Sequence, residues 1–342
     1  MHRCLQLAKL AQGQVEPNPM VGAVLEYDGR IIGEGYHEHY GQAHAEVNCI
    51  NSVKEEETQF ISKACLYVSL EPCAHFGKTP PCTDLIIASN IPKVIIGCRD
   101  PFVEVNGKGI EKLMVAGVEV VAGVLENECK ELNKRFFKLH EKKLPYIFLK
   151  WAQTGDGKIA SLNKERLLIT NEFTNRIIHT WRSEEQSILI GTNTALADDP
   201  ELTTRFCPGN NPVRLVVDMN LRLPTHLKLF DEKTKTIVFN LLKHEEGQTL
   251  SYYQLTEDAS LVHQILNALC KLNIQSVIVE GGTTLIQSFI DEGEWDEARI
   301  ITNEALIVGE GLPAPQLKNH QFVFSETIQT DNIVYYRNEL SK

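Results

Sequence analysis

The sequence predicts an α/β protein built from two domains. Its 342 residues are enough for about two domains of ~100–200 residues each. Strand-like apolar runs alternate with amphipathic segments in both halves, which favours a mixed or parallel sheet covered by helices on both faces. A charged run followed by proline at 141–145 indicates a joint. We therefore expect one domain over residues 1–144 and a second over 145–342.

The first half begins with an amphipathic helix near residues 5–11. Asp28-Gly29 separates two apolar runs and predicts a short hairpin turn. The expected strands cover residues 20–27, 30–36, 64–69, 93–98 and 118–121. The expected helices cover residues 43–53, 82–89, 108–116 and 126–140.

The second half repeats the alternation of strands and helices. Strands are expected at 146–151, 187–190, 213–218, 236–240 and 276–280. Helices are expected at 171–182, with Thr170 or Asn171 as the cap, and at 261–272 and 284–291. Apolar runs at 322–324 and 334–336 predict strands that either end the sheet or face a partner. A homo-oligomer is expected on that ground, although core packing explains these runs equally well.

Charge and cysteine content restrict the partners and the compartment. Lys plus Arg is 34 and Asp plus Glu is 45, so the net charge is −11. This balance argues against a general nucleic-acid binder or a binder of anionic membranes, since both need a basic surface. The sequence has neither an apolar run of ~18–20 residues nor a secretory leader. Nine scattered cysteines then read as reduced thiols, and we expect a cytoplasmic location.

His44, Cys73 and Cys82 form the most informative pattern in the chain. One imidazole and two thiolates suit zinc, a borderline-soft ion that takes nitrogen and sulfur ligands in a tetrahedron. Three protein ligands leave one position open, which is typical of a catalytic site where water is activated near neutral pH. Glu46 follows the histidine by two residues and can pass the proton to a leaving amine, as in zinc base deaminases. We expect one Zn2+ per chain and Glu46 as the catalytic group.

A structural zinc site is the alternative reading of these residues. Such a site would normally recruit a fourth Cys or His, and Glu46 would then have no role. The expected local structure favours catalysis, because His44 and Glu46 fall in the first turn of one helix and Cys82 opens the next. Cys73 follows the strand that ends near residue 70. Another Cys or His as fourth ligand is the remaining possibility.

Three segments of the first half resemble the family of bifunctional riboflavin-biosynthesis deaminase–reductases. They are Asn18-Pro19-Met20-Val21-Gly22, His44-Ala45-Glu46-Val47 and the run Leu70-Glu71-Pro72-Cys73-Ala74-His75-Phe76-Gly77-Lys78-Thr79-Pro80-Pro81-Cys82. Generic cytidine-deaminase relatives hold their two cysteines two residues apart, whereas eight residues separate them here. The resemblance implies an N-terminal three-layer α/β/α domain like that of cytidine deaminases.

The resemblance also implies the first substrate, a diaminopyrimidinone that carries a ribosylamino group with a 5′-phosphate. Hydrolysis at the ring carbon that bears the exocyclic amine releases ammonia. Lys78 and His75 are suited to the ribose-phosphate end, and Thr79 adds a hydroxyl donor; a solvated loop is the alternative. Asn18 is suited to orienting the ribose or the base, although an ordinary turn before Pro19 explains it too.

A glycine pair, Gly281-Gly282, lies between an expected strand and an expected helix in the second half. Glycines allow close backbone approach, and a helix N-terminus offers N–H donors to phosphate. The pair does not match the G-x-G-x-x-G fingerprint, so a standard Rossmann site is not indicated. Taken alone, the pair would more often be a simple turn.

Other segments of the second half resemble the reductase half of the same family. They are Lys150-Trp151-Ala152, Asp156-Gly157-Lys158-Ile159-Ala160, Gly191-Thr192-Asn193-Thr194, Ala197-Asp198-Asp199-Pro200 and Val279-Glu280-Gly281-Gly282. This half of the family is similar to dihydrofolate reductase in fold and uses NADPH, which implies hydride transfer to the opened ribose. The implied cofactor contacts are Ala152, Leu168, Thr194, Asp198, Gly282, Thr283, Thr284, Leu285, Ile286, Gln287 and Ser288. The implied substrate contacts are Arg166, Arg182, Leu202, Arg205 and Glu280.

Physical chemistry supports part of this second set. Guanidinium groups such as those of Arg182 and Arg205 suit a substrate phosphate, although surface ion pairs explain them as well. Asp198 and Glu280 could position a hydroxyl or a proton, or cap a helix or strand end. Family members carry serine and tryptophan where this chain has Arg166 and Leu168, and Gly155 replaces a larger residue. Contacts of the 161–170 loop therefore stay open.

Two other functions compete with the two-step enzyme. A deaminase that acts on nucleic acid is permitted by the zinc pattern, but the negative charge and the absence of a basic stripe with aromatics argue against it. A structural zinc protein that senses nucleotides is the non-enzymatic alternative. Replacement of Glu46 separates it from the enzyme, because a sensor would be little affected. We therefore expect a small phosphorylated pyrimidine as substrate, with neither nucleic acid nor membrane as partner.

Overall fold

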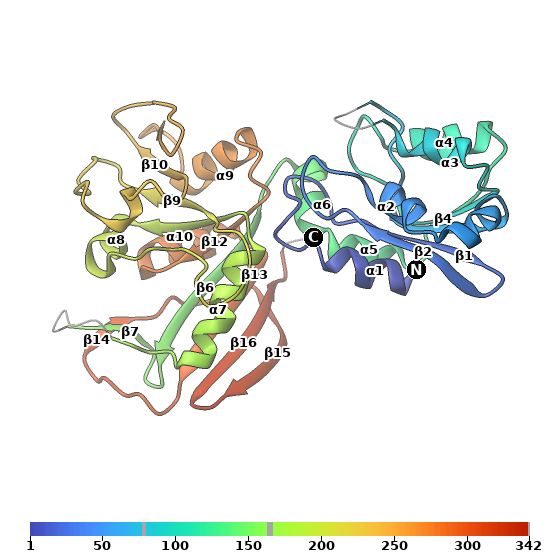
Figure 1. Ribbon diagram of the computed structural model, residues 1–342. Coiled ribbons are helices and arrows are strands. Elements are labelled where there is room, and N and C mark those ends of the chain that lie inside the picture. Colours follow the sequence, from blue (N-terminus) through green and yellow to red (C-terminus); the bar gives the residue numbers. More distant parts are fainter. Residues whose placement is uncertain (77–79, 163–166, 341–342) are drawn as a thin grey trace. The chain divides into compact units, whose positions relative to one another are not determined.

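The computed structural model describes residues 1–76, 80–162 and 167–340 (Figure 1). The chain divides into two compact units, Met1–Lys143 and Leu144–Lys342. Each unit contains its own sheet. Among the described helices, none is both long and apolar enough to cross a bilayer.

The first unit is built on a five-stranded sheet of order β2-β1-β3-β4-β5. Its strands are β1 (Gly22–Tyr27), β2 (Arg30–Tyr36), β3 (Cys65–Leu70), β4 (Lys93–Cys98) and β5 (Glu119–Ala122). β1 pairs antiparallel with β2 and β3, while β3, β4 and β5 run parallel. The hairpin predicted at Asp28-Gly29 is present, and both residues have positive φ, as a two-residue type I′ turn requires.

Helices cover both faces of this sheet (Figure 1). They are α1 (His2–Lys9), α2 (Ala45–Asn51), α3 (Cys82–Ala88), α4 (Lys108–Val115), α5 (Glu126–Leu132) and α6 (Lys134–Lys142), with a 3-10 helix over Glu55–Lys63. The period-2 alternation of β1 separates the two faces. Leu25 packs in the cluster that contains Cys49 of α2, whereas Val24 packs with Cys4 and Leu7 of α1. The expected three-layer α/β/α arrangement is confirmed.

The single helix expected over 126–140 is wrong, because the structure breaks it at Asn133. The backbone of Asn133 leaves the helical region at φ −104° and ψ 23°, which separates α5 from α6. Its buried side chain accepts the Met20 N–H at 2.8 Å and donates to the Met20 carbonyl at 2.9 Å. The amide thus fixes the segment that leads from Asn18 into β1.

The second unit contains a nine-stranded sheet of order β11-β10-β9-β8-β12-β6-β13-β16-β15. The strands from β11 to β13 run parallel, and β16 and β15 complete the sheet antiparallel. Their bounds are β6 (Tyr146–Thr154), β8 (Ser187–Gly191), β9 (Val213–Val217), β10 (Thr236–Asn240), β11 (Leu250–Gln254), β12 (Ser276–Glu280), β13 (Glu297–Asn303), β15 (His320–Ile328) and β16 (Asp331–Asn338). β7 (Lys158–Ser161) and β14 (Gly311–Pro313) form a separate pair. The strands β7, β11, β13 and β14 were not expected.

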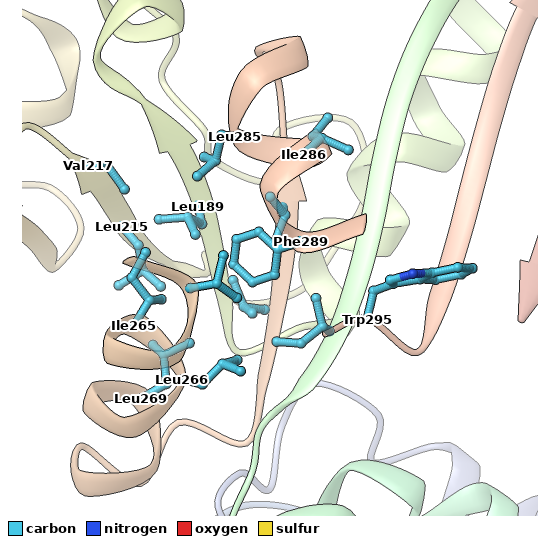
Figure 2. Close-up of a cluster of buried hydrophobic side chains, with 14 of the residues drawn as sticks. Leu189, Leu215, Val217, Ile265, Leu266, Leu269, Leu285, Ile286, Phe289 and Trp295 are labelled. Carbon is cyan, nitrogen blue, oxygen red and sulfur yellow. The ribbon is translucent and has the colours of Figure 1, made fainter. Parts of the chain in front are cut away.

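Helices cover this sheet too. α9 (Leu261–Lys271) and α10 (Thr283–Glu292) contribute to one core cluster, and α7 (Glu172–Glu184) and α8 (Thr192–Asp198) contribute to another. Figure 2 shows Phe289 of α10, Leu266 and Leu269 of α9, and Leu189 of β8 within one buried cluster. Asn171 is the cap of α7, since its side chain accepts the N–H groups of the second and third residues that follow. The expected two-part α/β class is confirmed.

Replacing Asn133 with alanine should destabilise the first unit. The substitution leaves the buried N–H and carbonyl of Met20 without their partners, which costs about 1–3 kcal/mol in the free energy of unfolding. Denaturant unfolding of the full chain measures this loss. Asn51→Ala, at an exposed position, is the control and should change the value by less than about 0.5 kcal/mol. Equal stability of the two variants would contradict the role given to Asn133.

Candidate active sites

Three ligand-type side chains converge at one point of the first unit. His44 is the residue immediately before α2, Cys73 lies in the loop after β3, and Cys82 is the first residue of α3. Nδ1 of His44 lies 3.6 Å from Sγ of Cys73 and 3.3 Å from Sγ of Cys82. All three ligand atoms lie within 4.8 Å of one another. The structure therefore brings together the three residues that the sequence analysis named as zinc ligands.

The donor set fits zinc. Bonds of about 2.0 Å to nitrogen and about 2.3 Å to sulfur in a tetrahedron need nitrogen–sulfur separations of about 3.5 Å, close to those present. Within residues 1–76, 80–162 and 167–340, no fourth His, Cys, Asp or Glu joins the group. Hydrogen bonds from the thiol of Cys82 and from His44 lower the pKa of Cys73 to about 4, despite its burial. A thiolate at Cys73 is the form that binds a cation.

Glu46 lies in the first turn of α2, two residues beyond His44, and its side chain is buried. Burial and the neighbouring Cys73 raise the pKa of this carboxyl group. Glu46 is not a member of the three-ligand group, so its oxygens stay available for proton transfer. This is the arrangement that an acid–base residue beside a three-ligand ion requires.

His37, which the sequence analysis missed, connects the predicted substrate residue Asn18 to this site. Nε2 of His37 lies 3.1 Å from Nδ2 of Asn18, and its Nδ1 lies 3.0 Å from the carbonyl oxygen of Ala43. The His37 ring also meets the His44 ring edge to face, with centroids 5.4 Å apart. A neutral imidazole that donates from Nδ1 and accepts at Nε2 satisfies both contacts. No local sequence pattern marks His37, because its partners come from two other segments, one with Asn18 and one with Ala43 and His44.

The remaining predicted deaminase residues lie in the loop between Cys73 and Cys82. His75 packs edge to face against Phe102, with centroids 6.1 Å apart, and its buried Nδ1 has no hydrogen-bond partner among residues 1–76, 80–162 and 167–340. Lys78 and Thr79 lie outside the described residues.

Glu71 organises the loop that flanks the metal ligands. Its buried carboxylate accepts N–H groups from Asp100, Gly107, Gly109 and Ile110 at 3.0–3.2 Å. Four such bonds from one side chain tie the segment after β4 to the residues just before Cys73. The Leu-Glu-Pro-Cys motif thus combines a loop anchor with a metal ligand, a role for Glu71 that sequence reasoning did not supply.

A buried cluster of charges marks the second unit. Glu280 ends β12, and Lys150 of β6 is its direct neighbour in the sheet. The Lys150 Nζ donates to Glu280 at 2.8 Å, and Nη2 of Arg182 on α7 donates at 2.9 Å. Although burial opposes ionisation of Glu280, the charges of Arg182 and Lys150 outweigh it and lower its pKa to about 2. The cluster holds two cations for one anion, and it unites predicted residues Glu280 and Arg182 with Lys150, which was not predicted as a contact.

The predicted substrate residues Leu202 and Arg205 lie in the segment after α8. The side chain of Leu202 is buried, and its φ of 53° is in the left-handed region, which is strained for a leucine. Nη1 of Arg205 donates to Glu201 and Thr203, both at 3.1 Å. Arg166, the last residue of this predicted set, lies outside the described residues.

The predicted cofactor positions surround the start of α10. A side chain at Gly281 would bring its Cβ within 2.7 Å of Thr194, and one at Gly282 within 3.0 Å, so these glycines let the backbone lie close to that threonine. Both have positive φ. Gly282 precedes the helix and has no side-chain cap, which leaves N–H groups of the first turn available.

The other cofactor positions differ in what they can offer a ligand. Leu285 and Ile286 are buried in the core, so only their backbone can meet one. Thr283 donates to the Pro313 carbonyl, Gln287 bonds with residue 316 and Ser288 donates to the Thr284 carbonyl. Ala152 packs against the core cluster to which α7 and α8 contribute. Asp198 is the last residue of α8, and the side chain of Leu168 is 76% exposed.

Comparison with known proteins decides the family. Residues 145–334 match the family model described as RibD C-terminal domain, and residues 1–98 match the cytidine and deoxycytidylate deaminase zinc-binding region. The riboflavin biosynthesis protein RibD of Aquifex aeolicus is 42% identical over 317 residues, which cover 91% of this chain and 88% of that one. The chain belongs to the RibD family. The RibD protein of Escherichia coli is 33% identical over 317 residues, covering 87% of this chain and 84% of its own.

Solved RibD structures agree with this assignment. A Thermotoga maritima protein described as a diaminohydroxyphosphoribosylaminopyrimidine deaminase/5-amino-6-(5-phosphoribosylamino)uracil reductase has a TM-score of 0.89 at 37% identity. It covers 99% of this chain and 97% of its own. Acinetobacter baumannii RibD has a TM-score of 0.87 at 28% identity and covers 98% of this chain and 97% of its own.

Membership of the RibD family confirms the resemblance stated from the sequence. It also confirms the expected bifunctional enzyme of riboflavin biosynthesis, with a zinc-binding deaminase region first and a reductase domain after it. The expected cofactors, zinc and NADPH, fit those two regions, and the His44, Cys73 and Cys82 donors fit zinc. Roles of individual site residues stay predictions.

Loss of either thiol should abolish tight metal binding. Cys73→Ser and Cys82→Ser each remove one of three donors, and the purified variants should hold less than about a tenth of the zinc of the parent chain. Elemental analysis of the dialysed protein measures the zinc content. Cys65→Ser, which replaces a half-buried thiol of β3 outside the cluster, is the control and should keep one zinc per chain. Full zinc occupancy in the Cys82→Ser protein would contradict the assignment.

Proposed function

We propose that this chain catalyses two consecutive steps of riboflavin biosynthesis. The first is zinc-dependent hydrolytic deamination of 2,5-diamino-6-ribosylamino-4(3H)-pyrimidinone 5′-phosphate. The second is NADPH-dependent reduction of the ribosyl chain to give 5-amino-6-ribitylamino-uracil 5′-phosphate. The observation that carries the proposal is the convergence of His44, Cys73 and Cys82 with Glu46 beside them. We assign the first step to residues 1–144 and the second to residues 145–342.

Glu46 transfers protons in the first step. A zinc ion held by the three ligands would supply Lewis-acid activation of water. The Glu46 carboxylate takes a proton from the water that adds to the amine-bearing ring carbon and gives it to the adjacent ring nitrogen. It then takes the remaining hydroxyl proton and gives it to the departing amino group. Ammonia leaves and the ring carbon becomes a carbonyl carbon. Burial of Glu46 keeps the transferred proton away from bulk solvent.

Four other residues of the first unit are assigned to the substrate. Asn18 orients the base or the ribose, with His37 fixing the direction of its amide. Nδ1 of His75 contacts the ribose-phosphate end, together with Lys78 and Thr79. These assignments extend the sequence prediction, and they are supported by the chemistry of lysine and histidine, which suit an anionic phosphate.

The second step needs a bound dinucleotide and an anionic substrate in one site. NADPH would supply the hydride that reduces C1′ of the opened sugar. The start of α10 beside Thr194 offers backbone N–H groups to its phosphates, as helix N-termini commonly do. Glu280 accepts a substrate hydroxyl, while Arg182 and Arg205 attract the substrate phosphate. The charges of Arg182 and Lys150 lower the pKa of Glu280, so its carboxylate stays an acceptor.

Self-association is the second part of the proposal. β15 is an edge strand, and its Phe322, Val323 and Phe324 side chains are 58%, 43% and 47% exposed. An edge strand with apolar side chains invites pairing with another chain. We propose that a second copy of this chain pairs there. The cytoplasmic location and the lack of nucleic-acid partners stay predictions from the sequence.

Glu46→Gln should abolish ammonia release from the diaminopyrimidinone phosphate, by at least about 100-fold, because the amide cannot move a proton. Zinc content should stay at that of the parent chain, and NADPH oxidation on the deaminated product should be unchanged. Coupled measurement of ammonia and NADPH follows both steps. Unimpaired deamination in this variant would leave a sensor or structural zinc site as the better reading. Tight, salt-sensitive binding to single-stranded nucleic acid would favour the nucleic-acid deaminase.

Phe322→Lys should weaken self-association, since a charge replaces an exposed apolar side chain at the edge of β15. Light scattering after size exclusion measures the mass. We expect a multiple of 38.5 kDa for the parent chain and 38.5 kDa for the variant. Val115→Lys, at an exposed position of α4, is the control and should keep the parent mass. A parent chain that elutes as a monomer would refute this part of the proposal.

A further inference from the structure

His179 is a buried histidine that the proposed reaction does not use. It lies on α7, three residues before Arg182, so both side chains project from the same side of the helix. Only 4% of His179 is exposed. Its ring meets Phe206 edge to face, with centroids 4.5 Å apart. The residue therefore stands between the helix that carries Arg182 and the segment that carries Arg205.

A hydrogen bond from Arg205 ties that segment to the helix, and a longer contact of 3.9 Å joins Cys207 to Ser183 of the same helix. The backbone N–H of Arg205 donates to Nδ1 of His179 at 2.9 Å. Burial and the nearby charges of Arg182 and Arg205 lower the pKa of His179 to about 4. Near neutral pH the imidazole is therefore uncharged, and a neutral ring that accepts at Nδ1 carries its proton on Nε2. The acceptor that Arg205 needs is available under ordinary conditions.

The segment that His179 holds has a backbone that requires support. Leu202 has a φ of 53°, and such strain persists only where surrounding contacts determine the conformation. The buried Leu202 side chain fixes one end of the turn. Further along, the Thr204 N–H donates to Asn211 at 2.8 Å. The bond from Arg205 to His179 is a short polar contact of 2.9 Å that holds this turn against α7.

The side chain of Arg205 does not fix the conformation of this turn. The side chain is 40% exposed, and its Nη1 pairs with Glu201 at 3.1 Å. Exposed ion pairs of this kind contribute little free energy, with a median of about 0–1 kcal/mol. The direction in which the guanidinium leaves the backbone therefore depends on the backbone anchor at His179.

We propose that His179 is a positioning residue of the reductase site, which accepts the Arg205 N–H and thereby sets where Arg205 meets the anionic group of the deaminated substrate. The inference rests on the proposed reductase function. It adds a residue that touches neither substrate nor cofactor and acts through Arg205. Because Arg182 lies three residues further along the same helix, His179 also fixes the spacing between the two arginines.

Two substitutions separate the hydrogen bond from the packing of the ring. H179N keeps an acceptor oxygen near the place of Nδ1 but removes the ring. H179F keeps a ring against Phe206 but removes the acceptor. The experiment measures reductase kinetics of the full chain with 5-amino-6-(5-phosphoribosylamino)uracil and NADPH. Deaminase turnover and NADPH affinity are measured on the same preparations.

H179F should raise KM for the uracil substrate about tenfold, with kcat changed less than about threefold. H179N should stay within about threefold of the parent KM. NADPH affinity and deaminase turnover should not change in either variant. An unchanged KM in H179F would overturn the proposal, and so would equal losses in the two variants, because ring packing would then be the relevant role.

Hydrogen exchange of the free protein gives a readout independent of turnover. Backbone amides of residues 202–206 should exchange faster in H179F than in the parent chain and H179N. Equal exchange in all three proteins would overturn the positioning role. A parent chain that oxidises no NADPH would instead be a failure of the proposed function, and the exchange result alone would then decide the role of His179.

Discussion

The convergence of one imidazole nitrogen and two sulfurs is the constraint on which the first unit depends. His44 precedes α2 and Cys82 opens α3, so two separate helix starts must reach the same point as the loop after β3. Because β3 pairs parallel with β4, the loops after both strands lie at the same end of the sheet. There the Glu71 carboxylate accepts four backbone N–H groups from the segment that follows β4. The distances between donors thus follow from the sheet and need no adjustment to suit an ion.

In the second unit, two neighbouring cations keep the carboxylate of Glu280 ionised. Glu280 is a carboxylate with little exposure at the end of a central strand, where desolvation alone would favour the neutral acid. Lys150 from the adjacent strand and Arg182 from α7 reverse that preference, and they leave the cluster with one excess positive charge. An anionic substrate and an anionic cofactor both suit such a site. The fold therefore places two of the positive charges of this site, Lys150 and Arg182, among largely buried residues, whereas Arg205 is more exposed.

Features that depend on neighbouring residues could be predicted from the sequence. The Asp28-Gly29 turn, the bounds of β2, β4, β10 and β12, and the grouping of His44 with Cys73 and Cys82 could be predicted from local pattern and spacing. Asn133 was mistaken for part of one helix, since its partner Met20 lies 113 residues away in the chain. Lys150 was quoted in a motif without a role, because only the register of β6 against β12 places it beside Glu280. His37 was not predicted as a site residue because its partner Asn18 is distant in the chain. β13 was not predicted because its mixed polar sequence has no alternating pattern.

X-ray absorption at the zinc edge of the purified chain would show which atoms bind the ion. We expect two sulfur neighbours at about 2.3 Å and two lighter neighbours at about 2.0–2.1 Å, one of which shows the multiple scattering of an imidazole. The second light neighbour must be exchangeable, so addition of a small competing anion should alter the spectrum. A shell of three or four sulfurs, or a fourth ligand from the protein that no anion displaces, would contradict an open position beside Glu46.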